Sequence, residues 1–357
     1  MTIRYRLDFL SLVQFLSQNG RFGWRIFRNA SNIFSRSTDD PMDIIPSLEA
    51  IREARRMIAK TAIRTPLVRL NVFESPAEIY LKLENLQPIG SFKIRGAANA
   101  MAHLSAEKLE KGVLTASAGN MAQGVAWCAR ERRIPATVIA PETAPKTKVA
   151  AIERLGGKVI QVPFDEWWQA FEDRSFPGVD GAFIHAFDDL QVMAGNGTIA
   201  LEILEELPDV DAIVIPWGGG GLACGIAAGI RELRAQCKIF AAEVETAAPL
   251  ALSLASGIPQ VADYQPSFVD GIGSKTVFPQ MLERAKTLID GSLIAKLDEV
   301  SSAIRLLAER NRIIAEGAGA VAVACGLGGK AGNGKVVCIV SGGNIDLEKL
   351  TSNLSAN

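Results

Sequence analysis

From residue 42 onward, short runs of apolar residues alternate with longer segments in which apolar residues recur at helical spacing. The short runs predict strands at residues 78–83, 113–116, 136–140, 158–162, 212–216, 238–244 and 335–340. The helical spacing predicts helices at residues 121–132, 146–155, 198–207 and 300–312. Because strands and helices alternate along the chain, we expect an α/β fold of open, mainly parallel sheets with helices on both faces.

The chain has 357 residues, which is long enough for two domains. We predict a large domain formed by residues 42–109 and 188–352, with a small domain, residues 110–187, inserted into it. Residues 1–41 form a basic extension, of which residues 1–38 contain six arginines and several serines but one acid, Asp8, a composition typical of an organelle transit peptide. The alternatives are a disordered basic tail and a true translation start at Met42, because the segment from Pro46 to Glu49 predicts the start of a helix.

Composition and charge exclude several classes of protein. The chain carries 38 basic and 39 acidic residues, so we expect no nucleic-acid partner. Its five cysteines are scattered and form no CxxC pair, which indicates reduced thiols and favours the cytoplasm, or an organelle matrix if the N-terminal segment is a transit peptide. Residues 212–230 lack charge but contain Pro216 and a run of glycines, so we expect a buried strand, a loop and a helix there, and no membrane partner.

Three predicted strands end in loops rich in small and polar residues. These loops begin at Ser117, Gly218 and Ser341, and ligands of open α/β sheets bind at such strand ends. Gly218 to Gly221 are four consecutive glycines before a predicted helix. Their backbone N–H groups and the helix N-terminus together favour a phosphate-binding loop over a simple packing turn.

A lysine adds a second piece of chemistry. Lys93 lies in the segment Gly90-Ser-Phe-Lys-Ile-Arg-Gly96, between an aromatic residue and small residues. Together with a phosphate-binding loop, such a lysine indicates a Schiff base with pyridoxal 5'-phosphate. On this segment alone, a surface lysine beside a helix start would be the simpler interpretation.

Four motifs in order resemble the threonine dehydratase and serine racemase family, whose members are pyridoxal-phosphate enzymes of fold type II. They are the segments that begin at Gly90 (GSFKIRGA), Ser117 (SAGNMAQG), Gly218 (GGGGL) and Ser341 (SGGN). The resemblance covers roughly residues 45 to 350. It implies that the protein is a lyase (an ammonia-lyase), with pyridoxal 5'-phosphate as cofactor and an amino acid as substrate.

The resemblance also implies roles for single residues. Lys93 would be the catalytic Schiff-base lysine. The cofactor would further contact Phe92, Asn120, Glu316 and Ser341, and its phosphate would bind Gly218, Gly219, Gly220, Gly221 and the N–H of Leu222. The substrate would bind Ser117, Ala118, Gly119 and the backbone of Met121. For Glu316, a helix-capping role is the alternative. A homodimer is the family expectation.

Two departures from the family pattern narrow the function. Serine racemases carry a second serine where this chain has Ala118, so Lys93 is the one evident base and elimination is favoured over racemisation. The metal pattern of cation-dependent relatives is matched at Glu243 and Ala247, but Pro249 replaces an aspartate, so no metal is predicted. We therefore expect a dehydratase that converts an L-β-hydroxy amino acid of the threonine or serine type into a 2-oxo acid and ammonia.

Several alternatives remain open at this stage. Trp167 and Trp168 are expected to pack in the core or a lid, or else to line a site for a bulkier substrate such as phenylserine; hydroxyaspartate is another candidate substrate. A β-replacement synthase would share the fold. Outside it, a nucleotide-dependent oxidoreductase would use residues 218–225, with Glu243 or Glu245 on the ribose. An inactive amino-acid-binding protein would need no Lys93.

Overall fold

The larger of two sheets has six strands, in the order β1-β2-β10-β7-β8-β9. The computed structural model describes residues 44–355 of the chain. All neighbouring strands in this sheet are parallel except β1 and β2, which are antiparallel. The strands are β1 (Leu67–Arg69), β2 (Glu78–Leu83), β7 (Ala212–Pro216), β8 (Lys238–Val244), β9 (Gly291–Ala295) and β10 (Lys335–Val340).

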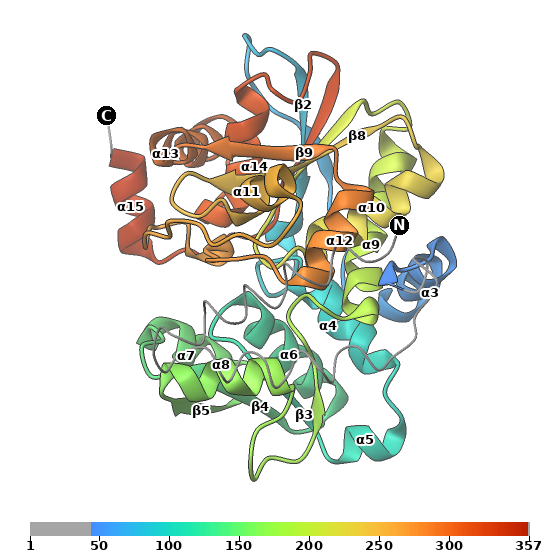
Figure 1. Ribbon diagram of the computed structural model, residues 1–357, viewed down its shortest axis with the longest axis vertical. Coiled ribbons are helices and arrows are strands. Elements are labelled where there is room, and N and C mark those ends of the chain that lie inside the picture. Colours follow the sequence, from blue (N-terminus) through green and yellow to red (C-terminus); the bar gives the residue numbers. More distant parts are fainter. Residues whose placement is uncertain (1–43, 356–357) are drawn as a thin grey trace, which may run out of the picture. The chain divides into compact units, whose positions relative to one another are not determined.

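The second sheet has four parallel strands in the order β5-β4-β3-β6. They are β3 (Val113–Ala116), β4 (Ala136–Pro141), β5 (Lys158–Val162) and β6 (Ala182–Phe183). Helices α6, α7 and α8 pack against these strands (Figure 1). All four strands lie within residues 110–187, for which the sequence predicts a small domain; the domain boundaries themselves stay a prediction.

Helices connect the strands of both sheets. They are α3 (Leu48–Ile58), α4 (Lys93–Ala102), α5 (Ala106–Glu110), α6 (Asn120–Arg132), α7 (Lys146–Arg154), α8 (Phe164–Asp173), α9 (Leu190–Glu206), α10 (Gly221–Leu233), α11 (Pro249–Ser256), α12 (Pro279–Leu288), α13 (Leu297–Leu306), α14 (Gly317–Leu327) and α15 (Leu347–Ser355). The predicted fold class is therefore confirmed.

All seven predicted strands are present, but two predicted helices need correction. Helix α9 begins at Leu190, eight residues before the predicted start at 198, because the carboxylate of Asp189 caps it by accepting from the N–H groups of Gln191 and Val192. The helix predicted over 300–312 is α13, which ends at Leu306 and is followed by a π-helical turn at Leu307–Asn311. The helix start predicted after Met42 is confirmed, since Ser47 caps α3.

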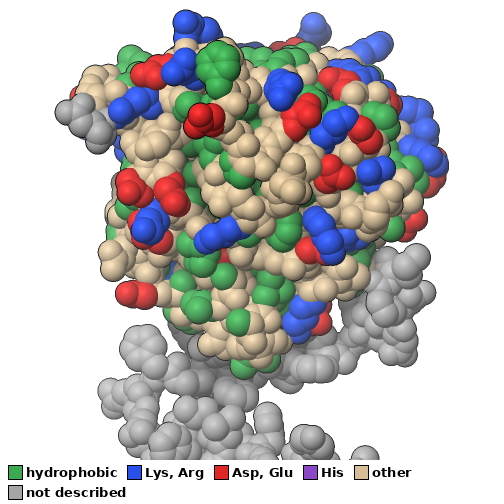
Figure 2. All heavy atoms as spheres, turned by 90° about the horizontal axis from the view of Figure 1, so that it is seen from above, with side chains coloured by type: hydrophobic (Ala, Val, Ile, Leu, Met, Phe, Trp, Pro, Cys, Tyr) green, Lys and Arg blue, Asp and Glu red, His purple; other side chains and the backbone are tan. Residues whose placement is uncertain are grey.

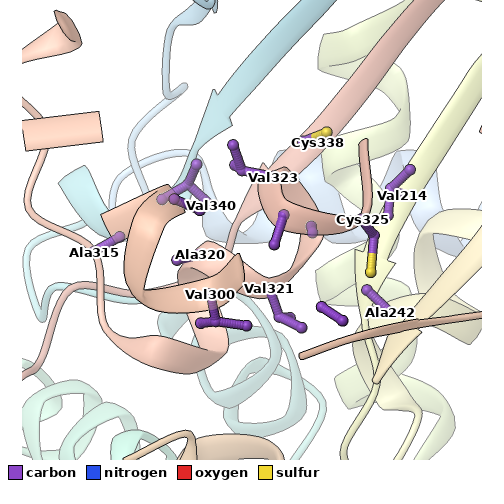
Figure 3. Close-up of a cluster of buried hydrophobic side chains, with 14 of the residues drawn as sticks. Val214, Ala242, Val300, Ala315, Ala320, Val321, Val323, Cys325, Cys338 and Val340 are labelled. Carbon is purple, nitrogen blue, oxygen red and sulfur yellow. The ribbon is translucent and has the colours of Figure 1, made fainter. Parts of the chain in front are cut away.

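The core under the six-stranded sheet is built around α14, whose first ten residues are all buried. Figure 3 shows Val321, Val323 and Cys325 of this helix among side chains of three neighbouring strands. Those side chains are Val214 of β7, Ala242 of β8, and Cys338 and Val340 of β10. This packing fixes the position of α14, and the N-terminal end of the helix therefore lies beside the end of β10.

Surface and thiol chemistry agree with an ordinary globular chain. On the face shown in Figure 2, basic and acidic side chains of the described residues are intermixed. All five cysteines are buried and unpaired, and burial raises the pKa of each thiol.

Within residues 44–355, no helix is long and apolar enough to span a bilayer. The predictions for residues 1–41 lie outside the described residues.

Candidate active site

The segment that carries Lys93 is joined directly to the loop after β10. Ser91 and Gly342 form an antiparallel bridge, and the N–H of Phe92 donates to the carbonyl oxygen of Ser341 over 3.0 Å. Helix α4 begins at Lys93 and contacts both α6 and α9. Sequence motifs that lie about 250 residues apart are therefore neighbours at one edge of the large sheet.

Lys93 is a partly buried lysine with a weakened basicity. Its Nζ donates to the carbonyl oxygen of Ala186 over 2.8 Å and lies 5.0 Å from the centre of the Phe92 ring. Burial lowers the pKa of the amine to about 8, although the charge of Glu316 acts in the opposite direction. A pKa near 8 leaves about a tenth of the amine neutral at pH 7, several hundred times more than for an ordinary lysine. Lys93 is thus suited to act as a nucleophile and as a base.

The glycine loop after β7 presents donors without acceptors. Within the part of the chain that the structure describes, no protein acceptor contacts the N–H groups of Gly218 to Leu222. Gly220 has φ of 89°, a conformation that favours glycine, and α10 starts at Gly221. A row of free N–H groups at a helix N-terminus is the arrangement that binds a phosphate, so the loop fits the phosphate of pyridoxal phosphate.

Asn120 and Glu316 form a polar pair in the same region. Asn120 Nδ2 donates to Glu316 Oε1 over 2.7 Å, and Asn120 Oδ1 accepts from Asn344 Nδ2 over 2.8 Å. Burial raises the pKa of Glu316 to about 7, against the opposing effect of the bond from Asn120. Glu316 precedes α14, but its side chain makes no capping hydrogen bond there. Its carboxyl group therefore faces Asn120 rather than the helix.

Ser341 and Gly342, in the loop after β10, lie next to this pair. Ser341 is 4% exposed, and its hydroxyl donates to the carbonyl oxygen of Ala318 over 3.3 Å. The donated proton leaves lone pairs of the hydroxyl oxygen for another partner. A Cβ added at Gly342 would lie 2.4 Å from Glu316 Oε1, so a larger residue there would force the carboxyl group to move.

The loop after β3 holds the predicted substrate-binding residues. Ser117, Ala118 and Gly119 are half-buried, and the Ser117 hydroxyl accepts from the Gly119 N–H over 3.2 Å. The side chain of Met121 is buried in the apolar core, so only its backbone is left for a ligand. A cleft of about 250 Å³ opens here, lined among others by Gly119, Asn120, Gln123, Lys148, Arg154 and Glu316.

Three residues of this site were not among the predicted site residues. The side chain of Asn344 donates to Asn120, the carbonyl oxygen of Ala186 accepts from Lys93, and Gly342 leaves space for the Glu316 carboxyl group. Asn344 and Gly342 belong to the Ser341 motif, so the motif was a signal for them. The Ala186 contact uses a backbone oxygen, which no side-chain pattern can reveal.

Trp167 and Trp168 lie in an aromatic layer on α8. The ring of Trp168 stacks on Phe171 at 5.7 Å and lies 6.1 Å from Phe278, which precedes α12. Phe171 in turn lies 5.6 Å from Phe187. These mutual contacts favour the packing interpretation of the two tryptophans.

The carboxylate of Glu243 is occupied by hydrogen bonds to neighbouring residues. Its two oxygens accept from the N–H groups of Leu250 and Ala251, each over 2.8 Å, and from the Ser292 hydroxyl over 2.6 Å. Glu243 thus caps α11 from a neighbouring strand. Among residues 44–355, no three His, Cys, Asp or Glu side chains form a metal-binding group. The contacts of Glu243 do not fit a cation site.

A mainly parallel α/β fold, a weakly basic lysine and a glycine loop with free N–H groups are together features of one class of enzyme, the pyridoxal-phosphate enzymes. Residues 58–342 match the family described as pyridoxal-phosphate dependent enzyme, and the chain belongs to this family. It is 42% identical to the L-threonine ammonia-lyase of Thermotoga maritima over 309 residues, which are 85% of this chain and 77% of that protein.

Two solved structures are also similar. The processed form of threonine deaminase isoform 2 from Solanum lycopersicum has a TM-score of 0.76 at 34% identity, covering 88% of both chains. Maize serine racemase has a TM-score of 0.78 at 29% identity, covering 87% of this chain and 97% of the other. The family membership decides against the nucleotide-dependent oxidoreductase.

Proposed function

We propose that the protein is an ammonia-lyase that dehydrates L-threonine or L-serine to a 2-oxo acid and ammonia. The observation that carries this proposal is the weakly basic lysine, Lys93, in a chain whose family is pyridoxal-phosphate dependent. The 42% identity to an L-threonine ammonia-lyase supports the choice of substrate.

When bound, the cofactor would supply an electron sink for the Cα of the bound amino acid, which would make the Cα proton acidic. Gly218 to Leu222 would hold its phosphate, Asn120 and Ser341 would orient its ring, and Phe92 would pack against it. Nζ of Lys93, with a pKa of about 8, takes the Cα proton. The Lys93 ammonium returns this proton to the β-hydroxyl, which leaves as water. The released enamine tautomerises to an imine, which water hydrolyses to a 2-oxo acid and ammonium.

Serine racemisation is the closest rival, because a serine racemase is among the similar structures. Racemisation needs a proton donor on the face of Cα opposite to the base. Ala118 stands in the loop after β3 where such a donor would be carried, and its methyl group cannot exchange a proton. We therefore expect elimination to exceed racemisation.

A bulkier or more acidic substrate is the second rival. Phenylserine would need an open aromatic wall, whereas Trp168 is packed against Phe171 and Phe278. Hydroxyaspartate has a second carboxylate and would need a cation to bind it. Arg154 lines the cleft and is the candidate for that role. Comparing kcat/KM for threonine, serine, phenylserine and hydroxyaspartate separates these candidates, and the largest value identifies the substrate class. A β-replacement synthase would instead require a second substrate for turnover.

The main experiment follows 2-oxo acid and ammonia release from L-threonine by the purified protein, together with chiral analysis of serine. Lys93→Ala is expected to lose turnover completely, while Lys146→Ala, an exposed lysine on α7, keeps it. Borohydride treatment and mass spectrometry of the Lys93 peptide establish cofactor attachment. If the protein carries cofactor on Lys93 but forms no 2-oxo acid from any of the four amino acids, the proposed reaction is wrong.

We further propose a homodimer that works in the cytoplasm. The support for the compartment is chemical: five buried, unpaired thiols suit a reducing environment. Sedimentation equilibrium of the purified protein tests the dimer, and fractionation of cells that produce the full chain tests the compartment.

A further inference from the structure

His185 is a buried histidine that the proposed reaction does not use. It follows β6 and is 2% exposed. The rings of Phe171 and Phe187 flank it, with centres 4.4 Å and 4.8 Å away. A buried polar ring among aromatic side chains needs a specific partner, because an unpaired polar atom is costly in the core.

The partners of His185 are backbone groups of its own loop. Its Nδ1 accepts from the N–H of Asp188 over 2.8 Å and from the N–H of Phe187 over 3.3 Å. A ring nitrogen that accepts carries no proton, so the ring is the neutral tautomer with the proton on Nε2. Burial and then the charges of Arg174, Lys93 and Arg284 lower the pKa of His185 to about 3, against the opposing charge of Asp188.

The loop that the His185 side chain stabilises contacts Lys93 through the backbone of Ala186. Ala186 lies between the histidine and the two N–H groups that it binds, and the Ala186 carbonyl oxygen accepts from Lys93 Nζ over 2.8 Å. The other end of the turn is fixed by the Asp188 carboxylate, which accepts from Arg284 and Arg174, each over 2.6 Å. The Ala186 carbonyl is therefore held in place from both sides.

We propose that His185 is a positioning residue for Lys93, because its Nδ1 folds residues 185–188 so that the Ala186 carbonyl holds the lysine amine. This inference rests on the proposed function, in which Lys93 moves the Cα proton. An acceptor on one N–H of the amine fixes the direction of its lone pair while the amine is neutral. The same acceptor stabilises the ammonium once the proton has been taken.

The test compares His185→Asn with His185→Leu. The Asn oxygen is attached to Cγ, as Nδ1 is, so it can accept from the same N–H groups; the Leu side chain fills the space without an acceptor. In the cofactor-free protein, competitive acetylation followed by mass spectrometry of the Lys93 peptide gives the pKa of the amine. We expect His185→Leu to lower this pKa by about one unit, because a charged donor loses its acceptor, and His185→Asn to restore it.

Kinetics of the holoenzyme provide the second readout. We expect kcat for threonine to fall about tenfold in His185→Leu with KM changed less than about twofold, and His185→Asn to recover most of kcat. The acid limb of the pH profile should move with the pKa of Lys93. If the Lys93 pKa is the same in the wild type and both variants, or if both variants are equally impaired, His185 is only structural and the proposal is overturned.

A measurement on the wild type keeps the proposal testable if His185→Leu does not fold. Nitrogen-15 NMR of labelled histidine is expected to show Nε2–H and an unprotonated Nδ1 that does not titrate between about pH 5 and pH 9. A proton on Nδ1 would overturn the proposal. Acetylation of Lys93 needs no substrate, so a response of the Lys93 pKa to His185 variants without threonine turnover would reject the proposed function and keep the positioning role.

Discussion

The carboxamide of Asn120 donates a hydrogen bond to Oε1 of Glu316 over 2.7 Å, although the two residues are 196 positions apart in the chain. Asn120 begins α6, which packs on the four-stranded sheet, and Glu316 precedes α14, which packs on the six-stranded sheet. The contact links elements of the two sheets at the site. It joins a neutral amide to a carboxyl group whose pKa burial raises to about 7.

This raised pKa predicts a pH-dependent stability cost at Glu316. The unfolded carboxyl releases its proton near its ordinary pKa of 4.5, whereas the folded one keeps it up to about 7. Stability from this group is therefore highest below pH 4.5 and is lost as the pH rises to 7. Glu316→Gln is neutral at every pH, so we expect it to exceed the wild type in free energy of unfolding by up to about 3 kcal/mol at pH 8.

Urea denaturation at pH 5 and pH 8 measures this difference. At pH 5 the difference should fall to about 1 kcal/mol, because this pH lies only slightly above the ordinary pKa of 4.5 at which the unfolded carboxyl ionises. A stability difference that does not change with pH would show that Glu316 has an ordinary pKa.

The glycine loop makes a prediction about cofactor affinity. A Cβ at Gly219 would lie 2.0 Å from a ring carbon of Phe187, so Gly219→Ala must displace either the ring or the loop. We expect the dissociation constant of pyridoxal phosphate to rise at least about tenfold, measured by titrating cofactor-free protein. Adding Phe187→Ala should recover part of the affinity, since it removes the clash.

Gly291→Ala on β9 is the matched control for that variant. Its nearest neighbour would be a ring atom of Phe240 at 3.9 Å, an ordinary contact, so the affinity should be unchanged. An unchanged affinity in Gly219→Ala as well would mean that the loop does not bind the phosphate.

Glu243 leads to a prediction about cations. Because its carboxylate already accepts from Leu250, Ala251 and Ser292, we expect EDTA and added Mg²⁺ to leave kcat unchanged. Glu243→Ala should instead destabilise the fold by about 1–3 kcal/mol, since it uncaps α11. A loss of activity in EDTA that Mg²⁺ restores would contradict this interpretation.

The strands and the motif residues could be predicted from the sequence because their signals are local. Apolar runs marked every central strand, and conspicuous loops followed β3, β7 and β10. The start of α9 was missed because Gly195 and Gly197 weaken its helical pattern. Those glycines serve distant contacts: added Cβ atoms would lie 2.4 Å from the Arg95 carbonyl oxygen and 2.7 Å from that of Gly225. Edge strands β1 and β6 have only three and two residues, and β9 begins with Gly291 and Ser292, so none of the three contains a long apolar run.

Within the site, side chains could be predicted and their electrostatics could not. Lys93 and Asn120 follow from motifs, but a pKa of about 8 for Lys93 depends on burial by residues from several elements. The role inferred for His185 likewise depends on backbone N–H groups and the Ala186 carbonyl. Such contacts arise only when the chain is folded.

Arg95, two residues after Lys93, makes the last prediction because it is the centre of a buried charge network. It donates to Glu84 over 2.8 Å and to Glu202 over 2.6 Å, and Lys82 donates to Glu202 over 2.6 Å. The four side chains carry two charges of each sign and are at most 6% exposed. Arg95→Met leaves two buried carboxylates with one cation, so we expect a loss of about 3–5 kcal/mol in unfolding free energy at pH 7.

The pH dependence of that loss separates charge imbalance from lost packing. Burial alone would raise the pKa of Glu84, but Arg95 holds it below 4.5 in the wild type. The stabilisation of Glu84 by Arg95 is therefore present at neutral pH and is lost in acid. The difference between Arg95→Met and the wild type should therefore shrink as the pH falls below about 5. Arg55→Ala, which breaks an exposed pair with Glu205, should cost less than about 1 kcal/mol. An equally small, pH-independent cost for Arg95→Met would show that the network contributes no more than a surface ion pair.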